Sequence, residues 1–256
     1  MTGVAKKTVM RLVAEVGAFC ADYQDRVFRN LKCERMQVDE CWSFCYCKQK
    51  NVTQDIAMNV PGAGDAWLWA AIDADTKLVP CWLIGKRDPI SAREFIEDLA
   101  SRLSNRIQLT SDGLKMYIRA VDKAFDGEID YAMLVKVYAN DPASEKRYSP
   151  AICTSCERNT IMGNPDPAHI STSYIERHNL SVRMTTRRFT RLTNALSKKL
   201  ENHIASVALT YFAYNFIKVN RTLRTTPAMA AGITDRLWDV NDLIAAWEAE
   251  EQRLAA

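Results

Sequence analysis

Residues 36–47 read MQVDECWSFCYC, a nearly uninterrupted run of apolar and aromatic side chains that is typical of a buried strand. Two runs of the same character follow, AWLWAAIDADT at 66–76 and KLVPCWLIGKR at 77–87. The segment Asp-Ala-Asp-Thr that separates these two runs has the composition of a tight turn. The three runs therefore predict three consecutive antiparallel strands.

Helices and strands are predicted to alternate after these three strands. Glu94 follows Ser91 by three residues, a capping-box pattern, and the apolar stripe behind it predicts a helix over 91–103. A buried strand, a helix and another strand are expected at 107–113, 114–125 and 129–139. The segment 141–170 is rich in Pro, Asn and Asp, which predicts a long loop that serves as a functional flap or as a simple surface connection.

Both ends of the chain are predicted to be helical. Apolar residues recur at steps of three and four through residues 1–30. Residues 171–220 are expected to form a basic helical part, and 239–256 an acidic amphipathic helix. The apolar side chains of that last helix suit either contact with a second copy or packing on the same domain, which is the preferred interpretation; they are Leu243, Ile244 and Trp247.

The composition excludes several classes of protein. With 48% hydrophobic and 25% charged residues, the 256-residue chain is not expected to be mainly disordered. It has no run of 18 apolar residues and no signal-peptide pattern, which predicts a soluble protein of the cytoplasm. Eight cysteines are too few for a disulfide scaffold and are expected to be reduced. Cys153 and Cys156 form one C-x-x-C pair, but a structural zinc site needs a second pair, so zinc is only the alternative interpretation here.

Positive charge is concentrated in one segment. Residues 177–224 contain ten Lys or Arg and one acid, Glu201, which gives a net charge of +9 in a chain whose total is +3. An ordinary solvated helix face usually mixes the two signs. A block of one sign favours contact with a polyanion such as nucleic acid.

Three carboxylates stand where a purely structural role explains them poorly. Asp39 interrupts an apolar strand, and Asp112 lies at the C-terminal end of the strand expected at 107–113, the edge where α/β sheets place ligands. Glu176 lies near the start of the basic helical part. Three antiparallel strands followed by alternating helices and strands also predict a ribonuclease-H-like α/β domain with a mixed sheet, and the chemistry of that fold depends on carboxylates.

Three segments resemble the DDE transposases of the insertion-sequence-one family: Met36–Phe44, Thr110–Tyr117 and Ser171–Leu200. The resemblance extends from Thr2 to about Trp238 and implies that the catalytic triad consists of Asp39, Asp112 and Glu176. These residues stand in a D-E-x-W-S-F run, a D-G pair and an E-R-x-N-L run.

The resemblance also implies how the chain is divided. Residues 1–32 correspond to the last helix of a helix-turn-helix, 33–224 to the catalytic domain with its basic helices, and 225–256 to a helical tail. Family members generally carry a zinc ribbon and a complete helix-turn-helix ahead of the catalytic domain, and the match here begins within the latter. Asn220 stands where the family run has His.

The implied chemistry uses metal ions. Carboxylates gathered in one cleft repel each other, and such hard oxygen ligands suit Mg²⁺ or Mn²⁺. Two ions would hold the attacking and leaving oxygens of a phosphoryl displacement. The implied activity is DNA cleavage at the ends of an insertion sequence followed by strand transfer, without a covalent protein intermediate. The implied partners are transposon ends and target DNA, brought together by a homodimer or larger oligomer associated with the nucleoid and not with a membrane.

The basic helix predicts where DNA binds. A single helix from Tyr174 onward would place Glu176, Arg183 and Arg187 in one stripe, since steps of four and seven share a face. Glu176 would then hold metal while the cations meet phosphates, each of which steepens the salt dependence of binding. The predicted DNA-contacting residues are Arg177, Asn179, Arg183, Arg187, Arg188, Arg191, Lys198 and Lys199.

Other polar residues have weaker claims to function. Glu40 is expected to point to the strand face opposite Asp39 and to stay outside the metal ligands. His178 is open to two interpretations, orienting water or phosphate beside Glu176 or a structural role, and His203 is interpreted as structural. The remaining acids are assigned to the hairpin turn (Asp73, Asp75) and to loops (Asp55, Asp65, Asp88).

Two alternative functions remain open at this stage. One is a ribonuclease-H-like nuclease that cuts DNA without joining it. The other is a non-catalytic DNA-binding remnant of a transposase. The complete set of three carboxylates favours catalysis, whereas the partial N-terminal match favours the remnant.

Overall fold

The computed structural model describes residues 3–138, 153–190 and 194–255. Six strands in this part of the chain form one mixed sheet in the order β3-β2-β1-β4-β5-β6. The pairs β1–β2, β2–β3 and β5–β6 are antiparallel, and β4 runs parallel to both of its neighbours, β1 and β5. The strands are β1 (Arg35–Cys45), β2 (Gly64–Asp73), β3 (Trp82–Gly85), β4 (Gln108–Ser111), β5 (Asp130–Tyr138) and β6 (Cys153–Met162). The three consecutive antiparallel strands expected from the sequence are confirmed.

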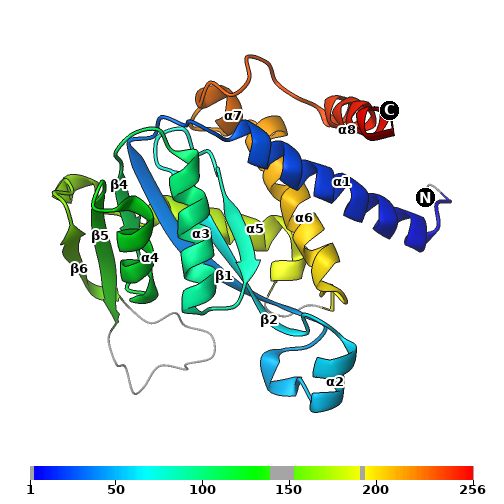
Figure 1. Cartoon of the computed structure of the whole chain (residues 1–256), viewed down its shortest axis with the longest axis horizontal. Helices are drawn as coiled ribbons and strands as arrows, with labels where there is room; N and C mark the ends of the chain where they lie inside the picture. The colour runs from blue at the N-terminus through cyan, green and yellow to red at the C-terminus, as the bar shows by residue number, and fades with distance from the viewer. Residues whose placement is uncertain (1–2, 139–152, 191–193, 256) are drawn as a thin grey trace.

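The described part of the chain contains eight α-helices. Figure 1 shows α3 and α4 on one face and α5 on the other, while α6 crosses α1 beside the sheet. The helices are α1 (Lys6–Val27), α2 (Gln54–Asn59), α3 (Pro89–Arg102), α4 (Met116–Phe125), α5 (Ser173–Thr185), α6 (Leu200–Phe212), α7 (Pro227–Ala230) and α8 (Val240–Ala255). None of these described helices combines the length and the apolar character that a membrane span requires.

Side chains along the strands alternate between two apolar layers, as the period of two in a strand demands. Trp69 packs into the layer that contains Phe95 of α3, whereas Leu68 packs into the layer that contains Ile175 of α5. Both faces of the central strands are therefore buried. This double burial explains why the strand sequences are almost continuously apolar.

Helix α1 packs closely against α6. A Cβ atom added at Gly17 would come within 2.6 Å of Cβ of Ala205, so the two helix backbones approach where neither residue has a large side chain. Val16 and Phe19 of α1 belong to the same core cluster as Leu243 of α8. Residues from the N-terminal segment and from the C-terminal tail thus share one apolar core with the sheet.

One expected connection differs from the structure, and another agrees with it. The segment 141–170 is not one long loop, because β6 occupies residues 153–162 and pairs with β5. Its side chains are mostly exposed, so its sequence lacks the apolar alternation from which a half-buried strand is recognised. In the hairpin expected at Asp73, the carboxylate accepts hydrogen bonds from the Asp75 amide at 3.0 Å and from the Thr76 hydroxyl at 2.6 Å, as a turn residue does.

Two helix boundaries also differ from the expectation. Helix α3 begins at Pro89 and not at Ser91, because Asp88 caps it by accepting a hydrogen bond from the Ser91 amide at 2.9 Å. The basic part is not one helix, since α5 ends at Thr185 and Thr186 is extended. A short 3₁₀ turn follows, in which Phe189 is buried in the apolar layer under α5.

Candidate active site

The sheet contains a cleft because β4 is shorter than the strands on either side of it. The last residue of β4, Ser111, pairs with Val38 and Met133, but β1 continues to Cys45 and β5 to Tyr138. Beyond Ser111 the space between β1 and β5 holds no strand. A cleft of about 440 Å³ occupies this place, at the carboxyl end of β4.

All three carboxylates proposed as a triad line this cleft. Asp39 lies within β1, Asp112 follows β4 directly, and Glu176 is in the first turn of α5. Gly113 beside Asp112 lets the chain pass β5 closely, since an added Cβ would lie 3.3 Å from a methyl group of Val135. Residues from three separate parts of the sequence therefore meet at one site.

The carboxylate of Asp39 is held by two donors. Its Oδ2 accepts a hydrogen bond from Nδ2 of Asn179 at 2.9 Å, and its Oδ1 accepts one from the Glu40 amide at 2.8 Å. Burial, followed by the negative charge of Asp112, raises the pKa of Asp39 to about 6. An acid in this setting favours binding of a cation.

Glu176 is paired with a lysine inside the cleft. Nζ of Lys136 on β5 lies 2.6 Å from Oε1 of Glu176, and the hydroxyl of Thr172 donates to the same oxygen. Partial burial opposes the charged form of Lys136, but its hydrogen bond to Glu176 raises its pKa. Lys136 was not singled out by the sequence, although a lysine inside the apolar run of β5 is a signal that could have identified it.

Glu40 lies closer to the triad than the sequence suggests. Its neighbours are Tyr117 of α4 and Arg87, so it does occupy the strand face opposite Asn179, as expected. Yet one carboxylate oxygen each from Asp39, Glu40 and Asp112 lies within 4.8 Å of the others. The sequence predicts that Glu40 stays outside the metal ligands, but the structure places it close enough to Asp39 and Asp112 to join them. Burial is the main reason why the pKa of Glu40 rises to about 7.

The predicted DNA-contacting residues are distributed over two regions. Arg177 is exposed on α5 and Arg183 half-buried there, while Asn179 is buried against Asp39. Because α5 ends at Thr185, Arg187 does not continue the stripe that begins at Glu176, and that part of the expectation is wrong. A separate groove of about 710 Å³ is lined by the cations Lys6, Arg187, Arg188, Lys198 and Lys199.

No described Asp or Glu lines that groove, so its charge is of one sign. We call it the basic groove. Lys199 also pairs with Glu201 at 3.2 Å, on an exposed part of the surface. Arg191 lies outside the described residues.

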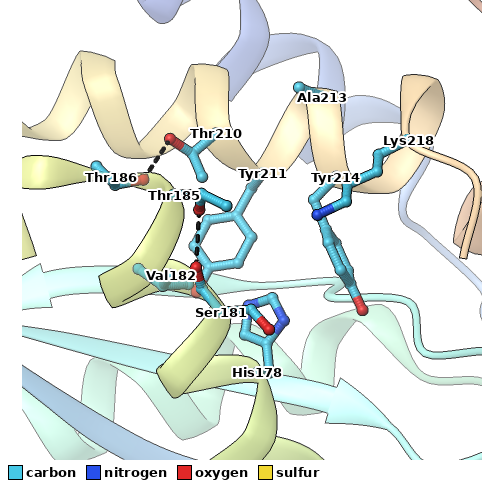
Figure 2. A pocket seen from close by; sticks show the side chains of 10 residues that line it. All are labelled: His178, Ser181, Val182, Thr185, Thr186, Thr210, Tyr211, Ala213, Tyr214 and Lys218. Atoms are coloured by element: carbon cyan, nitrogen blue, oxygen red, sulfur yellow. Dashed lines mark hydrogen bonds between the residues drawn. The ribbon is translucent and has the colours of Figure 1, made fainter.

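His178 faces away from the carboxylates. Figure 2 shows it in a cavity between α5 and α6, beside Tyr211 and Tyr214. Its ring stacks on Tyr211 with 5.4 Å between centroids, and burial lowers its pKa to about 4. The structure thus supports packing and not a role beside Glu176.

The other histidine and the cysteine pair have distinct surroundings. His203 is buried and bonds Ser43 and Ser197 through its two ring nitrogens, in agreement with a structural role. The thiols of Cys153 and Cys156 are exposed on β6 with 3.8 Å between sulfurs. Within the described residues, no third Cys, His, Asp or Glu completes a metal-compatible group with them.

Comparisons with known proteins give little further information. No protein-family model and no curated protein matches the chain. Among solved structures, the chain is similar to a piggyBac transposase in a synaptic complex with hairpin DNA determined by cryo-electron microscopy, with a TM-score of 0.35 and 10% identity. The match covers 87% of this chain and 54% of the transposase chain, so the chain spans about half of that length. A similarity of this size does not determine fold or function.

Proposed function

We propose that the protein is a DDE transposase with a ribonuclease-H-like catalytic domain, which cleaves DNA and joins the resulting 3′ ends to target DNA. The observation that carries the proposal is the convergence of Asp39, Asp112 and Glu176 on one cleft. The strand order is in keeping with it, since an antiparallel β3-β2-β1 unit continues into parallel β4 and β5.

The donors in the cleft fit Mg²⁺ or Mn²⁺. They are carboxylate oxygens, the ligands that these ions prefer, and one oxygen each from Asp39, Asp112 and the neighbouring Glu40 lies close enough to the others to touch one ion. When bound, two such ions would supply Lewis-acid activation of the attacking oxygen and stabilisation of the leaving one. Within the chain, Asn179 orients the Asp39 carboxylate, and Lys136 holds Glu176 at the rim.

The charges around the carboxylates suit a phosphodiester substrate. Arg87 and Lys136 line the same cleft and offer cations to phosphate oxygens near the acids. The basic groove adds further cations and has no acid among its described lining residues, which suits the backbone of a longer DNA segment. Pairing of two ends by an oligomer remains part of the proposal.

A strand-transfer assay tests the proposal. The substrate is a duplex with a free 3′-hydroxyl that carries the inverted repeat flanking the gene, incubated with supercoiled plasmid and Mg²⁺ or Mn²⁺. We expect joined product with the unchanged protein and none with Asp112→Asn. Glu157→Gln, an exposed change on β6, is the matched control and retains joining.

The assay also distinguishes the competing functions. Metal-dependent nicking of the duplex without joined product would identify a nuclease. DNA binding without nicking or joining, unchanged by Asp112→Asn, would identify a non-catalytic DNA-binding protein. Either result overturns the transposase assignment.

A further inference from the structure

Glu40 is a buried acid whose hydrogen-bonding capacity is only partly used. Its side chain is 1% exposed, and its Oε1 accepts no hydrogen bond of standard geometry from the described residues, although the buried Tyr117 hydroxyl lies near enough to offset part of the rise in its pKa that burial causes. Its Oε2 receives one contact, from Nε of Arg87 at 3.3 Å. A carboxylate removed from water normally gains several donors or a cation in compensation. One long contact and a neighbouring hydroxyl outside standard hydrogen-bond geometry compensate this buried carboxylate only in part.

The end of β4 explains how Glu40 reaches the cleft acids from the opposite face of β1. Only Arg35–Val38 of β1 pair with β4. Beside Asp39 and Glu40 the position next to β1 is therefore not filled by β4, and side chains from both faces of the sheet can approach each other there. Asp112 stands at this opening. The three carboxylate oxygens lie within 4.8 Å of one another, which is close enough for one divalent ion to touch all three, since each would lie about 2.0–2.6 Å from it.

Glu176 is not in this group of three. It lies at the rim, where Lys136 and Thr172 already occupy its oxygens. The acids of the site therefore fall into two sets. Asp39, Glu40 and Asp112 lie together, whereas Glu176 lies at the rim and is paired with Lys136.

We propose that Glu40 is the third carboxylate of a divalent-cation position at the floor of the cleft, together with Asp39 and Asp112. Glu176 belongs to a separate divalent-cation position at the rim of the cleft. This inference rests on the proposed metal-dependent function and assigns the residues of its ion sites. Arg87 balances part of the acidic charge when no cation is bound, and its guanidinium is kept in place over the Trp67 ring at 4.9 Å.

Titration of the whole protein with Mn²⁺, by calorimetry and by the electron paramagnetic resonance of the ion, tests the assignment without DNA. We expect Glu40→Gln to weaken the tightest Mn²⁺ site about tenfold or more, because it removes one charged ligand. Glu176→Gln leaves that site within about twofold of the unchanged protein and weakens only a second site. Glu157→Gln is the matched control for loss of an exposed acid.

Arg87→Gln separates ligation from the ion pair. If Glu40 acts only by holding Arg87, the loss of Arg87 weakens Mn²⁺ binding as much as Glu40→Gln does, and the inference is overturned. If Glu40 is a ligand, Arg87→Gln leaves binding unchanged or tightens it, since a competing cation is removed. Circular dichroism of each variant verifies folding, and Glu40→Asp, which keeps the charge but withdraws the oxygens, weakens binding in the same direction.

The outcomes also distinguish this inference from the proposed function. Loss of the tight site in Asp112→Asn, but not in Glu40→Gln, refutes the role of Glu40 and leaves the metal-dependent function intact. Mn²⁺ binding that is unaffected in both variants refutes the metal site itself.

Discussion

Nζ of Lys136 on β5 lies 2.6 Å from Oε1 of Glu176 on α5. The lysine and a cation at the rim of the cleft would compete for the same carboxylate. If Glu176 binds a metal ion as proposed, Lys136 would therefore set how readily its carboxylate becomes available.

Replacing Lys136 with Met should tighten Mn²⁺ binding at the rim. The change keeps most of the side-chain length and removes the positive charge beside Glu176, so we expect severalfold higher affinity for the second ion, measured by calorimetry at low ionic strength. Lys123→Met, on the exposed face of α4, is the control. If Lys136→Met and Lys123→Met raise the Mn²⁺ affinity equally, only the net charge of the protein affects that affinity.

Asn179→Ala should impair joining more than it impairs stability. Its Nδ2 orients Asp39 at 2.9 Å, but its buried Oδ1 has no hydrogen-bond partner in the described part of the chain, so removal of the side chain also removes an unsatisfied acceptor. We expect the unfolding free energy in urea to fall by about 1 kcal/mol and strand transfer to become roughly tenfold slower. Asn159→Ala on exposed β6 should change neither quantity. Unchanged strand transfer in Asn179→Ala would argue against this positioning role.

The basic groove should bind DNA through charge. We expect the double variant Arg187→Gln and Lys198→Gln to weaken duplex binding and to reduce the slope of log affinity against log salt by about 0.9 for each phosphate that is deprived of its cation. Mn²⁺ binding should not change. Substitution of Lys32 and Lys123, both exposed and outside the lining of the groove, controls for net charge. An identical salt slope in the two double variants would refute the groove as a DNA site.

Acid should destabilise the fold through His203. Burial, and then the charge of Arg188, lower its pKa from 6.5 to about 4. Because the unfolded chain takes up the proton first, the stability that this neutral ring provides is complete above pH 6.5 and is lost as pH falls toward 4, by about 1.4 kcal/mol for each pKa unit. His203→Gln should make the fall of the unfolding free energy across that range shallower, leaving the part that buried His178 contributes, whereas His169→Gln at an exposed site should not change the slope. A profile that is equally steep in His203→Gln would contradict this assignment.

The sequence predicts the elements whose side chains are buried. The strand containing Trp69 and the helices near Phe95 and Val121 are recognisable because packing imposes a period on them. Strand β6 was not predictable in this way, because its polar side chains are exposed and β5 holds it through backbone hydrogen bonds. The break at Thr186 was also not evident, since it follows from the burial of Phe189 under α5.

The candidate site was predictable in its residues but not in its arrangement. The sequence and the family resemblance single out Asp39, Asp112 and Glu176, and the structure places them around one cleft. The proximity of Glu40 depends on where β4 stops, and the pairing of Lys136 with Glu176 depends on the approach of α5 to β5. Neither relationship leaves a local pattern in the sequence.

The four-residue length of β4 has a mechanical consequence. Because the cleft is a missing portion of one continuous hydrogen-bonded ladder, its two walls cannot swing apart as two hinged lobes would. Adaptation to a substrate must come from long side chains such as Lys136 and Arg87, while the aspartate floor stays rigid. Lengthening β4 would extend backbone into the cleft, so the point at which this one strand ends determines the depth of the site.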